Sequence, residues 1–220
     1  LTPNGLPVDF HLLRHYGDQF EVEHAHELAG QPGKARVLVW RNRAVTASFA
    51  DATAYLLSHP GTDPETILQV RNGEKIKYGV GLNIEQALND DAGFFLRAMK
   101  ADGRTETYAF SEIDASLSTG ILLKGHLWGR AQDSVGMAYM DNRLSNDRRR
   151  YLEAGGMSFF IGDGPGNFRY GTEHGPEIFY NHGIGKNLWL TGDWQHITNP
   201  AYNALRGPVN VYAIRLHAEF

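Results

Sequence analysis

The segment Ser116–Arg130 alternates between apolar and mostly polar residues along its whole length. Leu117 and Ile121 fall on one face of an extended chain, and Lys124 and His126 fall on the other. A period of two residues is typical of a half-buried strand. The segment is longer than the ~5–6 residues usual in soluble sheets, whereas a tilted strand needs roughly 9–11 residues to cross a membrane. The pattern favours an antiparallel transmembrane β-barrel, although a soluble sandwich would also show it.

The last segment of the chain, Val209–Phe220, repeats the alternation. Tyr212 and Ile214 share a face with Phe220, whereas Arg215 and His217 lie on the opposite face. A terminal aromatic residue in the apolar register is a familiar recognition signal of bacterial outer-membrane barrels. The end of the chain therefore supports the barrel interpretation.

Similar alternation recurs along the chain, and the alternating segments are separated by Gly, Pro, Asn and Asp, which favour turns. This arrangement predicts an all-β fold. The predicted strands are Val8–Arg14, Phe20–Glu27, Ala35–Thr46, Ile76–Ala87, Gly93–Ala101, Thr105–Phe110, Ser116–Arg130, Ser134–Asn142, Phe168–Gly171, Glu177–Ile184, Asn187–Ile197 and Val209–Phe220.

Two segments between the predicted strands have helical character instead. Phe49–Ser58 ends before His59-Pro60-Gly61, which stops a helix. Ser145–Ala154 begins on a residue suited to cap a helix N-terminus and is followed by two glycines. We expect both segments to form helices in loops.

Composition excludes several classes of protein. Mean hydropathy is −0.39, and no run of residues approaches the ~20 apolar residues that a spanning helix needs. A net charge of −4 gives no basic signature for nucleic acid, and the absence of cysteine removes any disulfide framework. Many of the 25 glycines fall inside predicted strands, where glycine indicates a bent sheet or the close approach of another group. We expect no metal and no cofactor.

From Lys77 onward the sequence resembles the carbohydrate-selective porins of the OprB type. The longest matching motif is Asp193-Trp-Gln-His-Ile-Thr-Asn-Pro-Ala-Tyr-Asn203. The matching segments stand in family order and are Tyr78–Gln86, Ala92–Arg97, Ala109–Ser118, Leu123–Gly125, Trp128–Arg130, Asp133–Gly136, Tyr151–Gly156, Phe160–Gly164, Asp193–Asn203, Arg206–Val209 and Arg215–Phe220.

The resemblance implies a barrel of about sixteen strands in the outer membrane of a Gram-negative bacterium. It further implies passive diffusion of monosaccharides and similar small solutes, with no enzymatic activity. No secretory signal opens the chain, so we expect either that processing removed one or that the chain is a fragment. The number of predicted strands favours a single domain over residues 1–220 that forms the C-terminal half, or slightly more, of such a barrel, with no internal boundary.

A sugar pore needs hydroxyl-matching donors and acceptors, flat aromatic surfaces and a narrow section. Forked arginine donors and paired acceptors suit vicinal hydroxyls. Most residues on the polar faces could equally be solvated or paired into charge ladders. The candidates for lining the pore or contacting sugar are Asn83, Glu85, Arg97, Lys124, His126, Trp128, Arg130, Asp193, Gln195, Arg215, His217 and Glu219.

Among these candidates, Trp128 between Lys124 and Arg130 is the preferred sugar contact. The helix Ser145–Ala154 contains three consecutive arginines, which could narrow the pore or lie on a solvated surface that binds lipopolysaccharide phosphates. Glu112 and Asp114 share a strand face, as a hydrolytic carboxylate pair would, but no pocket is evident around them.

Aromatic residues near the strand ends suit a girdle at the membrane interface. We expect small sugars, outer-membrane lipid and lipopolysaccharide as partners, and recognition of Phe220 by the outer-membrane assembly machinery. The sequence leaves the oligomeric state open. Two alternatives remain: a soluble carbohydrate-binding protein or enzyme with a sandwich or barrel fold, and a barrel that serves as an adhesin or scaffold. The predicted girdle residues are Tyr78, Tyr139, Tyr180, Trp194 and Tyr212.

Overall fold

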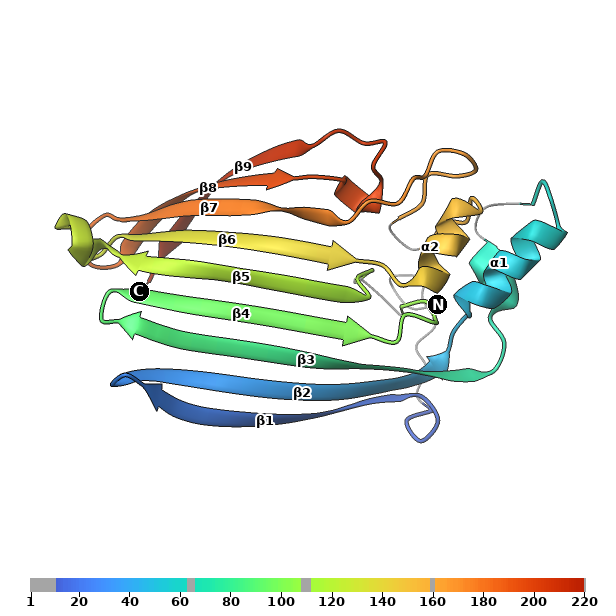
Figure 1. Ribbon diagram of the computed structural model, residues 1–220, viewed down its shortest axis with the longest axis horizontal. Helices are drawn as coiled ribbons and strands as arrows, with labels where there is room; N and C mark the ends of the chain where they lie inside the picture. The colour runs from blue at the N-terminus through green and yellow to red at the C-terminus, as the bar shows by residue number, and fades with distance from the viewer. Residues whose placement is uncertain (1–10, 63–65, 108–111, 159–160, 220) are drawn as a thin grey trace.

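The computed structural model describes residues 11–62, 66–107, 112–158 and 161–219. These residues form one antiparallel sheet in which each strand pairs with the next along the chain (Figure 1). The fold is therefore all-β, as predicted. The strands are β1 (Tyr16–Leu28), β2 (Gln31–Val45), β3 (Glu74–Asn89), β4 (Ala92–Ala101), β5 (Ala115–Lys124), β6 (Ser134–Arg143), β7 (Glu173–Gly183), β8 (Leu188–Ile197) and β9 (Val209–Ala218).

Connections at the two ends of the strands differ in length. Short turns join β1 to β2, β3 to β4 and β7 to β8 at the left of Figure 1. The first of these turns uses Ala29 and Gly30 with φ of 51° and 77°, as a two-residue hairpin turn requires. Long connections over residues 46–73, 102–114, 144–172 and 198–208 gather at the opposite end. We call these two ends the turn end and the loop end.

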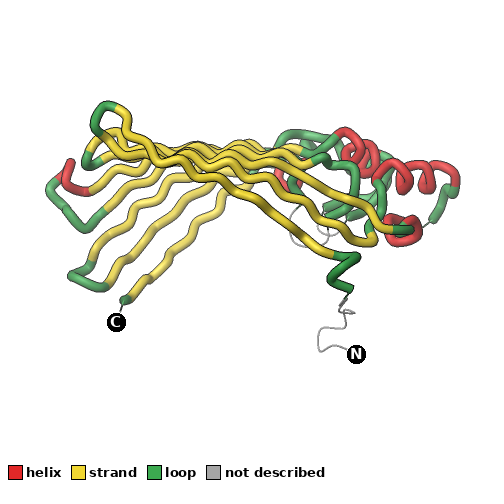
Figure 2. The backbone as a smooth tube through the Cα atoms, turned by 90° about the horizontal axis from the view of Figure 1, so that it is seen from below, coloured by secondary structure: helices red, strands yellow, loops and turns green. Residues whose placement is uncertain are grey.

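The sheet bends strongly, so its first and last strands curl out of the plane of the central strands (Figure 2). Among the described strands, β1 and β9 are not paired with each other, and each leaves one edge free. The described part of the fold is therefore an open, curved section of antiparallel wall.

The loop end carries the helices α1 (Phe49–Ser58) and α2 (Asn146–Glu153). Both begin at a serine cap: the Ser48 hydroxyl accepts from the Asp51 amide, and Ser145 accepts from the Arg148 amide at 3.1 Å. Both predicted helices are thus confirmed. No helix in the described part of the chain is long and apolar enough to cross a membrane. Three short 3₁₀ helices complete the structure, η1 (Thr66–Val70), η2 (Gly125–Trp128) and η3 (Pro200–Tyr202).

The predicted long strand Ser116–Arg130 is wrong beyond Lys124. There the chain enters η2, because the Gly125 amide bonds the Asp133 carbonyl at 2.8 Å and the Arg130 amide bonds the Gly125 carbonyl at 2.8 Å. These two hydrogen bonds fold residues 125–133 into a closed turn. The alternation past Lys124 therefore does not reflect a strand.

Two other short predictions also fail as strands. In Thr105–Phe110, Thr105 forms only an isolated bridge to Ser48, and residues 108–110 lie outside the described residues. In Phe168–Gly171, Tyr170 forms a single bridge to Asn203. Both segments belong to loop-end connections, where backbone pairing is local and brief.

Two predictions at the chain ends fall partly or wholly outside the described residues. In Val8–Arg14, residues 12–14 form a turn, closed by the Arg14 amide on the His11 carbonyl at 2.8 Å, and residues 8–10 are outside. Phe220 also lies outside the described residues.

The compact apolar core lies among the connections of the loop end rather than on the sheet. A folded sheet with a core on one face would bury one row of its side chains, but here both faces of the strands retain exposure. The core joins the three loop-end connections that contain helices, namely 46–73, 144–172 and 198–208, and the last of these contributes Tyr202. Its members are Ala47, Phe49, Ala52, Ile67, Leu144, Tyr151, Leu152, Ile161 and Tyr202.

Candidate functional site

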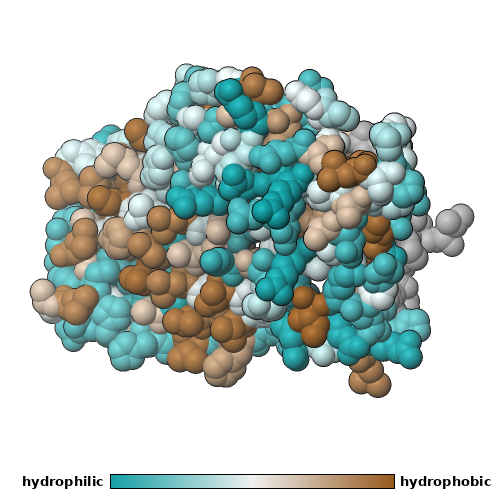
Figure 3. Space-filling view, turned by 45° about the vertical axis from the view of Figure 1, so that its right-hand side comes forward, coloured by the Kyte–Doolittle hydropathy of each residue, from teal (hydrophilic) through white to brown (hydrophobic). Residues whose placement is uncertain are grey.

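The strand register gives the sheet one continuous apolar face. Ile121, Met137, Ile178, Trp194 and Tyr212 are successive partners across β5 to β9. Ile121 is 39% exposed and Tyr212 77%. In Figure 3 apolar side chains (brown) gather toward the left of the view, whereas hydrophilic ones (teal) prevail elsewhere. An exposed apolar face of this extent indicates contact with another apolar phase or partner.

The opposite face, called here the polar face, is charged. On β1 to β3, Glu23 binds Lys34 at 3.0 Å and Arg36 at 2.6 Å, and Arg36 also binds Glu85 at 3.2 Å. Each exposed pair contributes little stability alone, because water and salt screen the two charges. Together they form a charge ladder that fixes the side chains against the wall.

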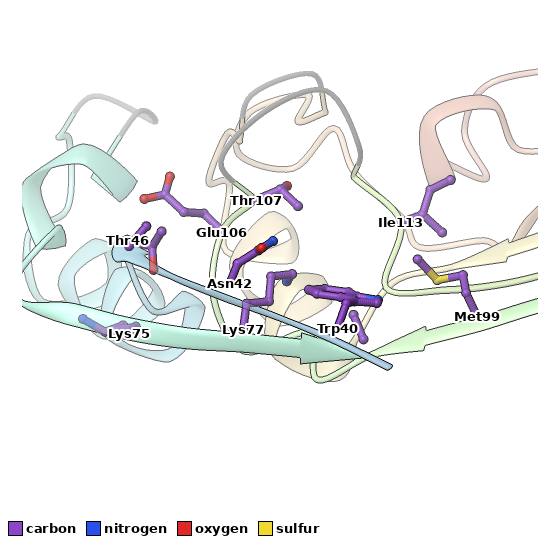
Figure 4. Close-up of a pocket in the computed structure, with 11 residues that line it drawn as sticks. Trp40, Asn42, Thr46, Lys75, Lys77, Met99, Glu106, Thr107 and Ile113 are labelled. Atoms are coloured by element: carbon purple, nitrogen blue, oxygen red, sulfur yellow. The ribbon is translucent and has the colours of Figure 1, made fainter. Parts of the chain in front are cut away.

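A loop-end connection folds over the polar face. Glu106, Thr107 and Ile113 from the connection between β4 and β5 lie above Trp40, Asn42 and Lys77. Together these residues line a cavity of about 360 Å³ (Figure 4). The Lys77 ammonium donates to the Thr105 carbonyl at 2.9 Å, which ties this connection to β3. Part of this connection is therefore held against the polar face at its loop end.

A polar curved wall with an apolar reverse face is the arrangement of a pore-forming barrel. The family model of carbohydrate-selective porins, the OprB family, matches residues 15–220. This chain belongs to the OprB family.

The comparison with solved structures agrees on the fold. OprB from Pseudomonas putida, in a structure determined at high pH, is similar to this chain with a TM-score of 0.76 and 16% sequence identity. The similarity covers 100% of this chain and 52% of that chain, so the chain spans about half the length of that porin. No curated protein matches the chain.

The described fold of this OprB-family chain contradicts the alternative of a soluble sandwich. A sandwich needs two sheets whose apolar faces pack together. Here the described strands form one sheet, and Ile121 and Ile214 stay 39% and 82% exposed. The predicted girdle residues all lie on the apolar face by register.

Seven predicted site residues of this OprB-family chain lie on the polar face, in two groups separated by β5 to β7. The first group consists of Asn83 and Glu85 on β3 and Arg97 on β4, where Arg97 is the register partner of Asn83. Asp193, Gln195, Arg215 and His217 form the second group on β8 and β9. Within the first group, Arg36 and Phe95 also take part, although the sequence interpretation did not select them.

The remaining predicted residues lie at the turn end. Lys124 ends β5 and donates to the Asp90 carbonyl at 2.7 Å, and Glu219 follows β9 and lies 3.1 Å from His217. The predicted strand positions of His126, Trp128 and Arg130 are wrong. His126 bonds Asp91 at 2.9 Å, and Trp128 donates to the Tyr180 hydroxyl at 3.3 Å.

Asp133 organises the turn that holds these residues. Its carboxylate accepts from Arg130, from the Tyr180 hydroxyl and from the Gly183 amide at 2.9 Å, with His182 at 3.2 Å. The Arg130 guanidinium, followed by these other donors, holds the pKa of Asp133 well below its usual range. Arg130 thus fixes the turn to β7.

A buried ion cluster locks the loop-end connections to one another. Arg148 of α2 is fully buried; its Nε lies 2.9 Å from Asp114 Oδ2, and its Nη1 lies 3.8 Å from Glu112. Lys77 of β3 lies 3.7 Å from the other Asp114 oxygen. The Arg148 guanidinium also stacks 4.7 Å above the Phe49 ring of α1. The pair Glu112 and Asp114 therefore holds an arginine and does not form a hydrolytic site.

A second contact fixes the connection that bears α1. Glu106 accepts two hydrogen bonds from Arg71, at 2.6 and 2.8 Å, and one from the Ala47 amide at 2.8 Å. The bond to Glu106 raises the pKa of Arg71 above its ordinary value, although partial burial opposes the shift. The described parts of connections 46–73, 102–114 and 144–172 are thus joined to one another, and we call them the loop-end assembly.

Proposed function

We propose that this chain forms part of the wall of a channel in the outer membrane of a Gram-negative bacterium, through which monosaccharides and similar small neutral solutes diffuse passively. The observation that carries the proposal is the division of the sheet into an exposed apolar face and a charged polar face. The apolar face contacts lipid, and the polar face contacts the water-filled lumen.

The chemistry of the polar face suits sugars. Arg97 offers a forked set of donors, Glu85 and Asp193 offer acceptors, and Asn83 and Gln195 offer both. Such groups replace the water around a hydroxylated solute without binding it so tightly that transit stops. The connection above Lys77 narrows the passage and limits the size of the solute.

The proposal also requires more strands than the described sheet contains. Lipid cannot hydrogen-bond unpaired backbone groups, so the free edges of β1 and β9 pair with further strands in the working channel. Lipid surrounds the apolar face, and lipopolysaccharide contacts its loop end. The assembly machinery recognises the C-terminal strand. We treat residues 1–220 as one domain of this barrel.

Liposome swelling tests this proposal. The complete product of the gene is reconstituted into liposomes, and the influx of glucose is compared with that of a neutral trisaccharide. We expect rapid swelling with glucose and little with the trisaccharide, because the passage is narrowed at the loop end. Protein that migrates as folded barrel before heating yet admits neither solute would contradict the proposal.

A further inference from the structure

Three aromatic side chains of the polar face each lie over a glycine of the neighbouring strand. A Cβ built on Gly120 would stand 2.5 Å from Cε1 of Phe95, and one on Gly79 would stand 2.6 Å from two ring carbons of Trp40. These distances are too short for any real side chain. The register pairs are Trp40 with Gly79, Phe95 with Gly120, and Phe179 with Gly136.

The missing glycine side chain determines how each ring lies. A ring that occupies the Cβ space of the next strand lies along the wall instead of standing out from it. One side of the Phe95 ring is then against the Gly120 backbone, the guanidinium of Arg97 lies over the ring, and Phe95 remains half-buried. Each glycine in these pairs therefore converts an aromatic side chain into a flat surface on the polar face.

Phe95 has the most complete polar surroundings of the three. It lines a wide cavity of about 550 Å³ together with Lys34, Glu85, Arg97 and Leu122. The guanidinium carbon of Arg97 lies 5.3 Å from the centre of the Phe95 ring. Arg97 has no carboxylate within 4 Å in the described part of the chain, so its donors are available to a ligand.

The neighbouring acceptor is held in place independently of Arg97. Glu85, directly opposite Phe95 in the register, is fixed by Arg36 at 3.2 Å, and Arg36 is fixed in turn by Glu23. The Glu85 carboxylate remains 46% exposed and keeps acceptor capacity. A flat apolar ring is thus flanked by a forked donor and a fixed acceptor.

We propose that Phe95, Arg97 and Glu85 form a weak binding subsite for a pyranose sugar, with Phe95 as its stacking surface. This inference rests on the proposed function. The C–H groups on one side of a pyranose ring carry a small positive charge on their hydrogens. The negative face of an aromatic ring attracts them, as it attracts cations. The exposed Arg97 side chain moves off the ring as the sugar stacks and donates to adjacent hydroxyls, and Glu85 accepts from one of them. The subsite favours ring sugars over open-chain polyols of the same size.

Phe95→Leu tests the subsite, because leucine keeps an apolar side chain but removes the flat ring. Phe20→Leu is the matched control, since Phe20 of β1 pairs with Val39 on the apolar face and is not among the residues that line this cavity. Glucose and sorbitol are each titrated as blockers of the ion current through single channels formed by the complete protein. For Phe95→Leu we expect roughly a threefold to tenfold rise in the half-blocking glucose concentration, with sorbitol unchanged. Phe20→Leu should match the unaltered protein.

Two further variants keep the subsite testable if Phe95→Leu fails to assemble. Phe95→Tyr retains the flat ring and should keep the preference for glucose over sorbitol, while Arg97→Gln should weaken glucose block without removing the preference. Equal block by glucose and sorbitol in the unaltered protein would overturn the subsite, as would an unchanged glucose value in Phe95→Leu. Failure of the unaltered protein to pass glucose at all would instead overturn the proposed function.

Discussion

Ile121→Arg is expected to prevent the protein from assembling in the outer membrane, whereas Leu122→Arg should assemble. The two residues are neighbours on β5 and are similarly exposed, 39% and 43%, but they lie on opposite faces. An arginine on the lipid face of a barrel costs about 2–4 kcal/mol near the bilayer centre, whereas one that faces the lumen stays in water. The amount of assembled protein should therefore differ sharply between arginine substitutions at these two neighbouring positions.

The assay for this pair is heat-modifiable migration of the protein extracted from outer membranes. Folded barrel migrates faster before heating, and the folded fraction should fall strongly for Ile121→Arg only. Equal assembly of the two variants would show that the apolar face does not contact lipid.

Arg148→Met is expected to lower the free energy of unfolding of the loop-end assembly by about 3–5 kcal/mol, because it removes the guanidinium that lies between two buried carboxylates and leaves Asp114 with Lys77 at 3.7 Å. Asp114 is 3% exposed and Glu112 7%, so water cannot replace the guanidinium. Methionine preserves much of the apolar contact with Phe49. The strands should persist while the connections loosen.

Limited proteolysis of intact proteoliposomes measures this loosening, because cleavage within residues 144–172 requires the loop-end assembly to open. Arg150→Met is the control, since Arg150 lies on the same helix and is exposed. We expect faster cleavage in Arg148→Met and an unchanged rate in Arg150→Met. Equal cleavage rates would mean that the ion cluster does not hold the connections.

Sequence patterns predicted the elements whose signals are local. Period-two alternation located most strands, the stop after Ser58 marked the end of α1, and the cap at Ser145 marked the start of α2. The end of β5 could not be found in this way, because it depends on the Gly125 amide reaching the Asp133 carbonyl across a turn. Alternation that continues past such a turn has no structural meaning.

The site was predicted less well because its key contacts join distant residues. Arg148 follows a polar helix pattern, yet Asp114 and Glu112 from another connection bury it. Phe95 stands in a Phe-Phe pair that gives no sign of which ring faces the lumen. Its partner Gly120 lies on the next strand, so only the register shows that the ring lies beside a glycine. The glycines inside strands predicted a bent sheet or a close approach of other groups, and the structure has both.

The central claim is that one face of this sheet contacts water in a lumen and the other contacts lipid. The chain contains no cysteine, so single cysteines can be introduced without background from it. Ile121→Cys and Met137→Cys lie on the apolar face, and Leu122→Cys and Ala138→Cys lie on the polar face. In the folded, membrane-inserted protein, a small water-soluble maleimide should label the cysteines at 122 and 138 quickly and leave those at 121 and 137 unlabelled. Equal labelling of all four would contradict the claim.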